Sequence, residues 1–194
     1  MPNRLTLWRF VLTAFFLVAS FIAFPGHDTV ALLFFAAASL TDYYDGKIAR
    51  RDGLITDFGI LMDPLADKIL ICSAFIAFVG RGLMPAWMVV IVVARELAIT
   101  GLRLLASSKN HVLAAEGYGK HKTISQITAI IAILVSVSYE SWGPLGIGIF
   151  GIELFGAPWV EGFSEVAKWV AVLLTMFSGF LYLWRNRALY LEDL

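Results

Sequence analysis

The chain has 194 residues, of which 59% are hydrophobic and 15% are charged. A composition this apolar lies outside the usual range of soluble domains and indicates that much of the surface meets lipid. The formal net charge is zero, so the molecule as a whole has no field that would attract nucleic acid, and we expect no nucleic-acid partner.

Apolar runs of about twenty residues are the signal for helices that cross a bilayer, whose hydrocarbon core is about 30 Å thick. We expect six of them, at residues 5–24, 29–50, 56–79, 85–106, 120–139 and 164–184. Short connections, such as the turn signals Pro25-Gly26 and Asp52-Gly53, favour an antiparallel bundle. The predicted fold class is therefore an all-α integral membrane protein, with six transmembrane helices in one bundle and a single domain over residues 1–194.

The stretch at residues 143–162, between the fifth and sixth predicted helices, is also apolar. It holds several glycines and two prolines, which make a regular spanning helix costly. We therefore expect an interfacial or re-entrant loop here instead of a seventh span.

Lysine and arginine concentrate at one end of the predicted bundle. With an even number of spans, that end holds Arg4, Arg9, Lys47, Arg50, Arg51, Arg103, Lys109, Lys120, Lys122, Arg185 and Arg187. The opposite end holds little beyond Arg81 and Lys168. Because basic segments stay on the cytoplasmic side, we expect a multi-pass protein of the cell membrane with both termini in the cytoplasm.

Four aspartates near this basic end carry the chemical signal. Asp42 and Asp45 lie in the second predicted helix, and Asp63 and Asp67 lie in the third. Residues three or four apart share a helix face, so each pair forms an acidic stripe. Since the turn at Asp52-Gly53 makes the two helices neighbours, facing stripes would bring four carboxylates together, toward the cytoplasm.

Four carboxylates in so small a volume repel one another unless a cation is present. Their hard oxygen atoms suit Mg²⁺ or Mn²⁺, as one ion or as a pair. The small residues Gly46, Ala49 and Gly59 lie on or beside the stripes and leave room for a bulky ligand. Arg50 can neutralise phosphate oxygens through bidentate contacts. Together these residues indicate a site for a diphosphate.

An alternative is that the aspartates only cap helices and pair with basic residues at the membrane surface. The available cations are Lys47, Arg50, Arg51 and Lys68. For a single aspartate the two interpretations are evenly matched. Four aspartates at two matched spacings, with glycines between them, favour the ligand site.

The pattern D-x2-D-G-x2-A-R-x8-G-x3-D-x3-D, from Asp42 to Asp67, resembles the signature of the CDP-alcohol phosphatidyltransferase family, and every position of the signature matches. Residues 2–6, 95–97, 101–103 and 119–123, with Gln126, are similar to the branch that makes phosphatidylglycerophosphate. The resemblance implies transfer of the phosphatidyl group from CDP-diacylglycerol to glycerol 3-phosphate, with release of CMP. It also implies a homodimer.

The resemblance implies residue roles as well. The metal, Mg²⁺ or Mn²⁺, would be held by Asp42, Asp45, Asp63 and Asp67. The nucleotide and diphosphate would bind at Asn3, Gly46, Ala49, Arg50 and Gly59, with Arg9 also near the nucleotide. Asp67 would be the catalytic base that takes the proton from the acceptor hydroxyl, a metal ligand, or both in turn.

Cations in the fourth and fifth predicted helices are candidates for binding the phosphate of the acceptor. Arg95 lies about ten residues into its helix, roughly 15 Å deep, and should face the bundle interior. Arg103 follows two turns later, and Lys120 and Lys122 open the fifth helix. Alternatively, Arg103 forms a structural ion pair with Glu96 on its own helix face, either directly or through another helix, and the lysines only mark the membrane boundary.

Two other functions remain open at this point. The same chemistry could use a different acceptor, such as an inositol phosphate. A divalent-cation transporter could use the intramembrane aspartates as an ion path. A transporter should place them near the midplane between broken helices, whereas these acids lie toward one face, which disfavours transport.

Overall fold

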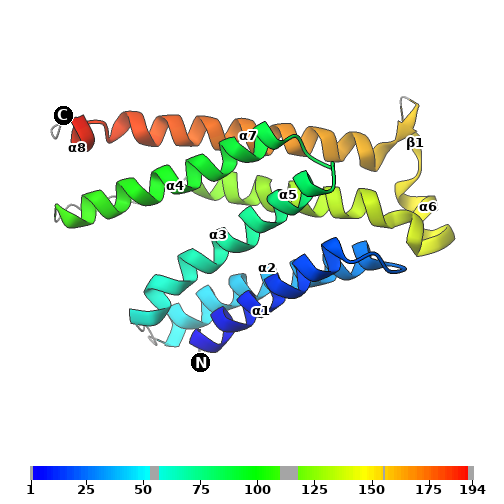
Figure 1. Ribbon diagram of the computed structural model, residues 1–194, viewed down its shortest axis with the longest axis horizontal. Coiled ribbons are helices and arrows are strands. Elements are labelled where there is room, and N and C mark those ends of the chain that lie inside the picture. The colour runs from blue at the N-terminus through cyan, green and yellow to red at the C-terminus, as the bar shows by residue number, and fades with distance from the viewer. Residues whose placement is uncertain (1, 53–56, 110–117, 155, 192–194) are drawn as a thin grey trace.

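The structure is a computed structural model that describes the backbone of residues 2–52, 57–109, 118–154 and 156–191. Side chains are described over the same ranges except at residues 2–5, 42–52, 57–61, 63–64, 118–120 and 191. In these ranges the long helices are α1 (Pro2–Phe21), α2 (His27–Asp52), α3 (Asp57–Gly80), α4 (Ala86–Ser108), α5 (Tyr118–Ser138) and α7 (Trp159–Arg185), shown in Figure 1. The short elements are η1 (Tyr139–Trp142), α6 (Gly143–Phe150), β1 (Glu153–Leu154), β2 (Ala157–Pro158) and α8 (Ala188–Leu191).

The six predicted helical segments coincide with the six long helices. The turn signals act where they were expected: Gly26 adopts a φ of 77° between α1 and α2. Pro85 directly precedes α4, with φ −63° and ψ 136°. This conformation is extended and not helical, so α4 begins at the next residue. The periodic apolar runs and their breakers were therefore sufficient to locate these helices.

Within the described residues, two helical stretches are long and apolar enough to cross a membrane, His121–Phe150 and Trp159–Arg185. The apolar stretches described in α1 and α2, Thr6–Phe21 and His27–Thr41, are shorter. The length and apolar composition of these two stretches therefore suggest a membrane protein.

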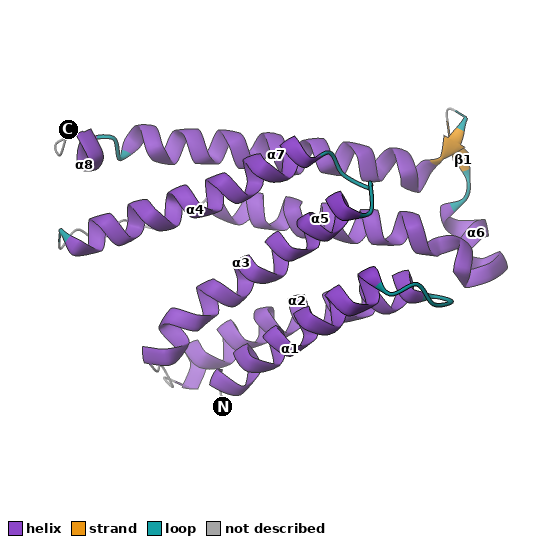
Figure 2. Ribbon diagram, viewed as in Figure 1, coloured by secondary structure: helices purple, strands orange, loops and turns teal. Residues whose placement is uncertain are grey.

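The described part of the connection between α5 and α7 forms no additional long helix, as we expected, but it is more regular than a loop. It contains the 3₁₀ turn η1, the short helix α6, and an antiparallel pair in which Glu153 lies opposite Pro158. Gly156 turns this hairpin with a φ of 86°, a conformation that glycine adopts without strain. This hairpin is a small strand pair that the predicted all-α class did not include, in a chain whose described residues are otherwise mostly helical (Figure 2).

The last long helix also begins earlier than we expected, at Trp159 instead of Ser164. Aromatic packing explains the extra turn. The Trp159 ring stacks on Phe150 of α6 with 5.8 Å between the ring centroids, and it lies 6.1 Å from Phe163 one turn later. These contacts hold the first turn of α7 against α6, and apolar periodicity alone does not reveal them.

The helices pack in two groups, which are connected by α3 and by the packing of α2 against α5. α1 and α2 lie side by side, α5 packs along α7, and α7 also packs against α4 (Figure 1). α3 contacts α1 on one side and α4 and α5 on the other. The N-terminal end of α1 and the C-terminal helix α8 lie toward the same end of the molecule, and α6 and the hairpin lie at the opposite end (Figure 1).

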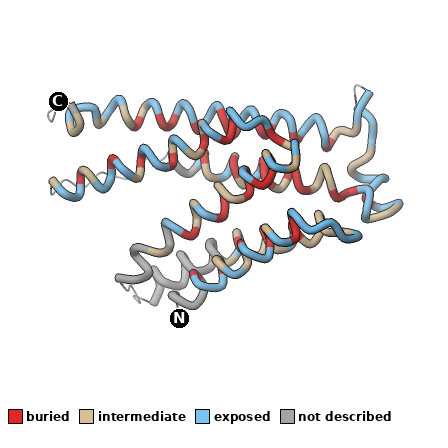
Figure 3. The backbone as a smooth tube through the Cα atoms, viewed as in Figure 1, coloured by how far each residue is buried: buried red, intermediate tan, exposed pale blue. Residues whose placement is uncertain are grey.

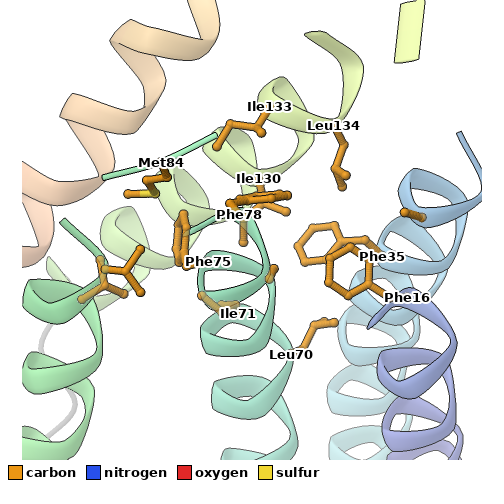
Figure 4. Packing of buried hydrophobic residues seen from close by; sticks show 14 of the residues in the cluster. Phe16, Phe35, Leu70, Ile71, Phe75, Phe78, Met84, Ile130, Ile133 and Leu134 are labelled. Atoms are coloured by element: carbon orange, nitrogen blue, oxygen red, sulfur yellow. The ribbon is translucent and has the colours of Figure 1, made fainter. Parts of the chain in front are cut away.

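One buried apolar cluster draws residues from all six long helices. Its largest members include Phe16 of α1 and Phe35 of α2, whose ring centroids lie 5.8 Å apart, and Phe75 of α3, which packs beside Phe78 (Figure 4). Ile130 of α5 and Val172 of α7 complete the cluster from the other group of helices. The buried positions face the interior, while the outer faces of the helices are largely exposed (Figure 3) and carry large apolar side chains.

Candidate functional site

The four motif aspartates lie on two helices that follow each other in the chain. Asp42 and Asp45 belong to the last three turns of α2, and Asp63 and Asp67 belong to the first three turns of α3. Only residues 53–56 separate the two helices, so the helical placement of the motif is confirmed. The side chains of Asp42, Asp45 and Asp63 lie outside the described residues, and the facing of the stripes stays a prediction.

The proposed nucleotide residues are placed only through their backbone. Asn3 lies in α1, Gly46, Ala49 and Arg50 lie in α2, and Gly59 lies in α3. Their side chains are outside the described part of the structure. The backbone of these helices nevertheless brings the three segments to one region, because α1 packs against both α2 and α3.

Asp67 is the motif aspartate whose side chain is described, and it pairs with Arg9 of α1. The Arg9 Nη1 donates to Asp67 Oδ1 at 2.5 Å. The Arg9 side chain is 1% exposed, whereas the Asp67 side chain is 43% exposed. The Arg9 side chain is therefore buried between the helices, and it binds the Asp67 carboxylate, which is partly exposed at the surface of the bundle.

The buried face of α1 explains how an arginine comes to lie there. Residues three and four apart form that face, namely Thr6, Arg9, Thr13, Phe16, Ala19 and Ser20. The Thr13 hydroxyl donates to the Arg9 carbonyl at 2.7 Å within the helix. The buried face of α1 is thus polar over its first turns and mainly apolar from Phe16 onward. Phe16 packs in the apolar core, and the polar turns before it lie beside Asp67 of the acidic motif.

Arg95 and Lys122, two of the predicted acceptor-binding residues, lie together in the interior. Both pair with Glu96: Arg95 Nη1 lies 3.2 Å from Glu96 Oε1, and Lys122 Nζ donates to the same oxygen. The side chains of Arg95, Glu96 and Lys122 are 14%, 9% and 6% exposed. We call these three residues the Glu96 cluster.

Arg103 lies apart from that cluster. It is exposed, its Nε donates to the Tyr182 hydroxyl at 3.3 Å, and its guanidinium lies 5.7 Å from the centroid of the Tyr182 ring. The alternative ion pair between Arg103 and Glu96 is therefore wrong, because Glu96 faces Lys122 on α5 instead. The Lys120 side chain lies outside the described residues.

Lys68, the residue after Asp67, connects α3 to α4. Its Nζ donates to the Thr100 Oγ1 at 2.5 Å, and that hydroxyl donates to the Glu96 carbonyl at 2.7 Å. The alternative interpretation of the motif predicts that Lys68 pairs with an aspartate at the surface, whereas the contact that the structure describes for Lys68 is the one to Thr100. A short polar path therefore leads from the neighbour of Asp67 to the Glu96 cluster.

Sequence reasoning missed several polar residues of the interior. Sequence patterns predict only a structural pairing for Glu96, and they assign no residue of α7 to the site. Ser178 accepts a hydrogen bond from Arg95 Nη2 at 3.4 Å, and Gln126 Nε2 donates to Thr175 at 3.0 Å. Gln126 follows Lys122 by four residues, so a shared helix face was the available signal.

Metal binding is judged by the donor atoms. Among the described side chains, no group of three or more His, Cys, Asp or Glu residues could hold an ion. Three of the four motif aspartates lie outside that search. The donor set itself consists of carboxylates at the adjoining ends of two helices, and such oxygen atoms fit Mg²⁺ or Mn²⁺.

The chain is similar to known proteins over most of its length. The model of the CDP-alcohol phosphatidyltransferase family matches residues 1–177. The CDP-diacylglycerol–glycerol-3-phosphate 3-phosphatidyltransferase of Bacillus subtilis is 36% identical over 198 residues, covering 96% of this chain and 94% of the relative. The enzyme of that name from Sodalis glossinidius is 31% identical, with 96% and 94% covered. A probable phosphatidylglycerophosphate synthase of Mycobacterium tuberculosis is 37% identical, with 95% and 80% covered.

Proposed function

This chain belongs to the CDP-alcohol phosphatidyltransferase family, and from that premise we propose that it transfers the phosphatidyl group of CDP-diacylglycerol to glycerol 3-phosphate. The products are phosphatidylglycerophosphate and CMP. The observation that carries the proposal is the near full-length similarity to relatives that bear the name of this activity. No described feature favours an inositol phosphate as the acceptor or ion transport as the function.

The reaction exchanges one P–O bond for another. The acceptor hydroxyl oxygen bonds to the phosphatidyl phosphorus, the bond from that phosphorus to the CMP oxygen breaks, and CMP leaves with the electron pair. The hydroxyl proton goes to Asp67, which acts as the general base. In support, the Asp67 carboxylate is partly exposed and is held at a fixed place by buried Arg9.

Four carboxylates, those of Asp42, Asp45, Asp63 and Asp67, would hold Mg²⁺ or Mn²⁺. When bound, the metal supplies positive charge to the diphosphate and to the leaving phosphate of CMP. The position of these residues at the adjoining ends of α2 and α3 supports the assignment.

The nucleotide and diphosphate would lie along the same ends of α1, α2 and α3. Gly46, Ala49 and Gly59 carry at most a methyl group and would leave room for the ligand. Arg50 would contact phosphate oxygens, and Asn3 would lie beside the nucleotide. Support comes from the packing of α1 against α2 and α3, since the Arg9 contact to Asp67 brings α1 to the motif.

The acceptor phosphate would bind to Arg95 and Lys122, with Arg103 and Lys120 nearer the helix ends. In the described cluster, two buried cations share one carboxylate, which leaves positive charge for an anion. Such a site selects glycerol 3-phosphate over an uncharged alcohol, because an acceptor without phosphate would leave that charge without compensation.

We further infer a multi-pass protein of the cell membrane with six spans in one bundle and with the site and both termini in the cytoplasm. Each of the six long helices has at least 20 residues, about 30 Å at 1.5 Å per residue. The opposite end holds few Lys and Arg residues, chiefly Arg81 and Lys168, and the distribution of Lys and Arg between the two ends sets the orientation. The homodimer that the family resemblance implies stays a prediction.

An acceptor assay tests the proposed function. Purified protein in detergent is incubated with CDP-diacylglycerol, Mg²⁺ and either glycerol 3-phosphate, inositol phosphate or no acceptor. We expect CMP release and a new phospholipid only with glycerol 3-phosphate. Equal CMP release with inositol phosphate would contradict glycerol 3-phosphate as the specific acceptor. Mg²⁺ flux into proteoliposomes without CDP-lipid would instead support ion transport as the function.

A further inference from the structure

Glu96 occupies the centre of a buried charged cluster. Its Oε1 accepts from Lys122 of α5 and lies 3.2 Å from Nη1 of the adjacent Arg95. A buried carboxylate with a single cationic partner would be a closed structural pair. Here one oxygen serves two cations from two helices, so the position of each cation depends on the same carboxylate.

The other side of Arg95 lies against α7. Its Nη2 donates to Ser178 at 3.4 Å, and the Ser178 hydroxyl in turn donates to the Thr175 carbonyl at 3.2 Å. At Gly179 a Cβ would come within 2.7 Å of Arg95 Cγ, a distance that a side-chain carbon does not tolerate. The glycine therefore makes the space through which the arginine side chain passes.

The charge balance indicates that an anion belongs in the cluster. Buried charges are stable only when they are paired and hydrogen-bonded. The contacts described for these residues pair Arg95 and Lys122 with one carboxylate, which leaves one positive charge uncompensated. A phosphate would supply the missing charge, and guanidinium and ammonium groups are its usual donors.

We propose that Glu96 is a positioning residue, which aligns Arg95 and Lys122 for the phosphate of the acceptor, and that Gly179 maintains the space that Arg95 requires. This inference rests on the function proposed above. Glu96 acts through its two cations and takes no proton in the reaction. Its loss therefore affects the binding of the acceptor and leaves the binding of the CDP-lipid unchanged.

The test is a steady-state comparison of Glu96→Gln with the wild type, with each substrate varied in turn. Glutamine keeps the shape of the side chain but removes the charge that orders both cations. We expect the KM for glycerol 3-phosphate to rise about tenfold or more, since a misaligned charge contact costs at least that factor. The KM for CDP-diacylglycerol and kcat should stay within about twofold of the wild-type values, as uniform binding loss predicts.

A second variant keeps the inference falsifiable if Glu96→Gln does not fold. Gly179→Ala adds one methyl group against Arg95 and changes no charge, so it should also raise the KM for glycerol 3-phosphate. Gly162→Ala on the same helix is the matched control, because a Cβ there meets nothing within 4 Å. Equal acceptor KM values for the two alanine variants would overturn the inference.

The outcomes separate this inference from the function on which it rests. A wild-type protein that transfers no phosphatidyl group to glycerol 3-phosphate would overturn both. Wild-type transfer with an unchanged acceptor KM in Glu96→Gln would overturn the role of Glu96 alone. A parallel rise of the KM values for both substrates would show a structural role and would likewise overturn it.

Discussion

The carboxylate of Asp67 on α3 lies 2.5 Å from the guanidinium of Arg9 on α1. These residues are 58 positions apart in the chain, and the contact makes α1 part of the site. The Arg9 side chain is buried by helix packing, whereas the Asp67 side chain is partly exposed. If Asp67 is the base, this pair predicts that the N-terminal helix contributes to a reaction whose signature residues lie on α2 and α3.

Arg9→Lys should lower kcat by about tenfold to a hundredfold, the equivalent of roughly 1.4 to 2.8 kcal/mol in the barrier. Lysine retains the charge but lacks the planar fork of donors that fixes the carboxylate. The measurement is the rate of CMP release at saturating substrates. Leu7→Ala, at an exposed position of the same helix, is the control and should retain the wild-type rate. If Arg9→Lys kept the wild-type kcat, the contact between Arg9 and Asp67 would have no role in catalysis.

Asp67→Asn should lower kcat by about a hundredfold to ten-thousandfold, the range that a lost general base produces. The amide keeps the size of the side chain and can still accept a hydrogen bond from Arg9, so the thermal unfolding temperature should change little. Single-turnover CMP release measures the chemical step. A variant that releases CMP at more than about a tenth of the wild-type rate would exclude Asp67 as the base, because that loss is smaller than base catalysis contributes.

Phe75→Ala should destabilise the bundle, because Phe75 is fully buried where helices from both groups meet (Figure 4). Truncation of a buried Phe leaves a cavity and costs about 3 kcal/mol, at the low end of the soluble range because lipid is itself apolar. Thermal unfolding in detergent measures the loss. Phe177→Ala, exposed on α7, is the matched control and should unfold like the wild type. Equal destabilisation by both variants would contradict the packing described here.

Cysteine labelling should place the two ends of the molecule on opposite sides of the membrane. Cys72, the one cysteine of the sequence, is first replaced by serine. Glu153→Cys in the hairpin should then react with an impermeant maleimide in intact cells, and Arg187→Cys beyond α7 should react only after permeabilisation. Both positions are exposed, so access alone decides the result. The reverse pattern would invert the proposed orientation.

The sequence was a good guide to the helices and to the position of the motif, because both depend on local signals. Apolar runs ended by Pro25-Gly26 or begun after Pro85 need no tertiary information. The first turn of α7 could not be predicted in this way, because Trp159 is held there by its ring contact with Phe150. The β1–β2 hairpin likewise depends on a glycine turn within an apolar segment that had no strand periodicity.

The site was predictable in part for the same reason. Spacing identified the four aspartates, and depth in the membrane indicated that Arg95 faces the interior. The partners across helices could not be read from spacing: Glu96 was matched with Arg103 on its own helix, whereas the structure pairs it with Lys122 on α5. The contribution of Gly179 depends on how closely α4 approaches α7, which no local pattern encodes.

In the proposed reaction, the acidic ends of α2 and α3 act together on one metal-bound diphosphate. The most direct measurement is Mn²⁺ binding to the purified protein, followed by electron paramagnetic resonance with CDP-diacylglycerol present. We expect the wild type to bind Mn²⁺, and we expect Asp42→Asn on α2 and Asp63→Asn on α3 each to weaken that binding at least tenfold. Binding that is unchanged in either variant would contradict the account, because the two helices would then not share the ion.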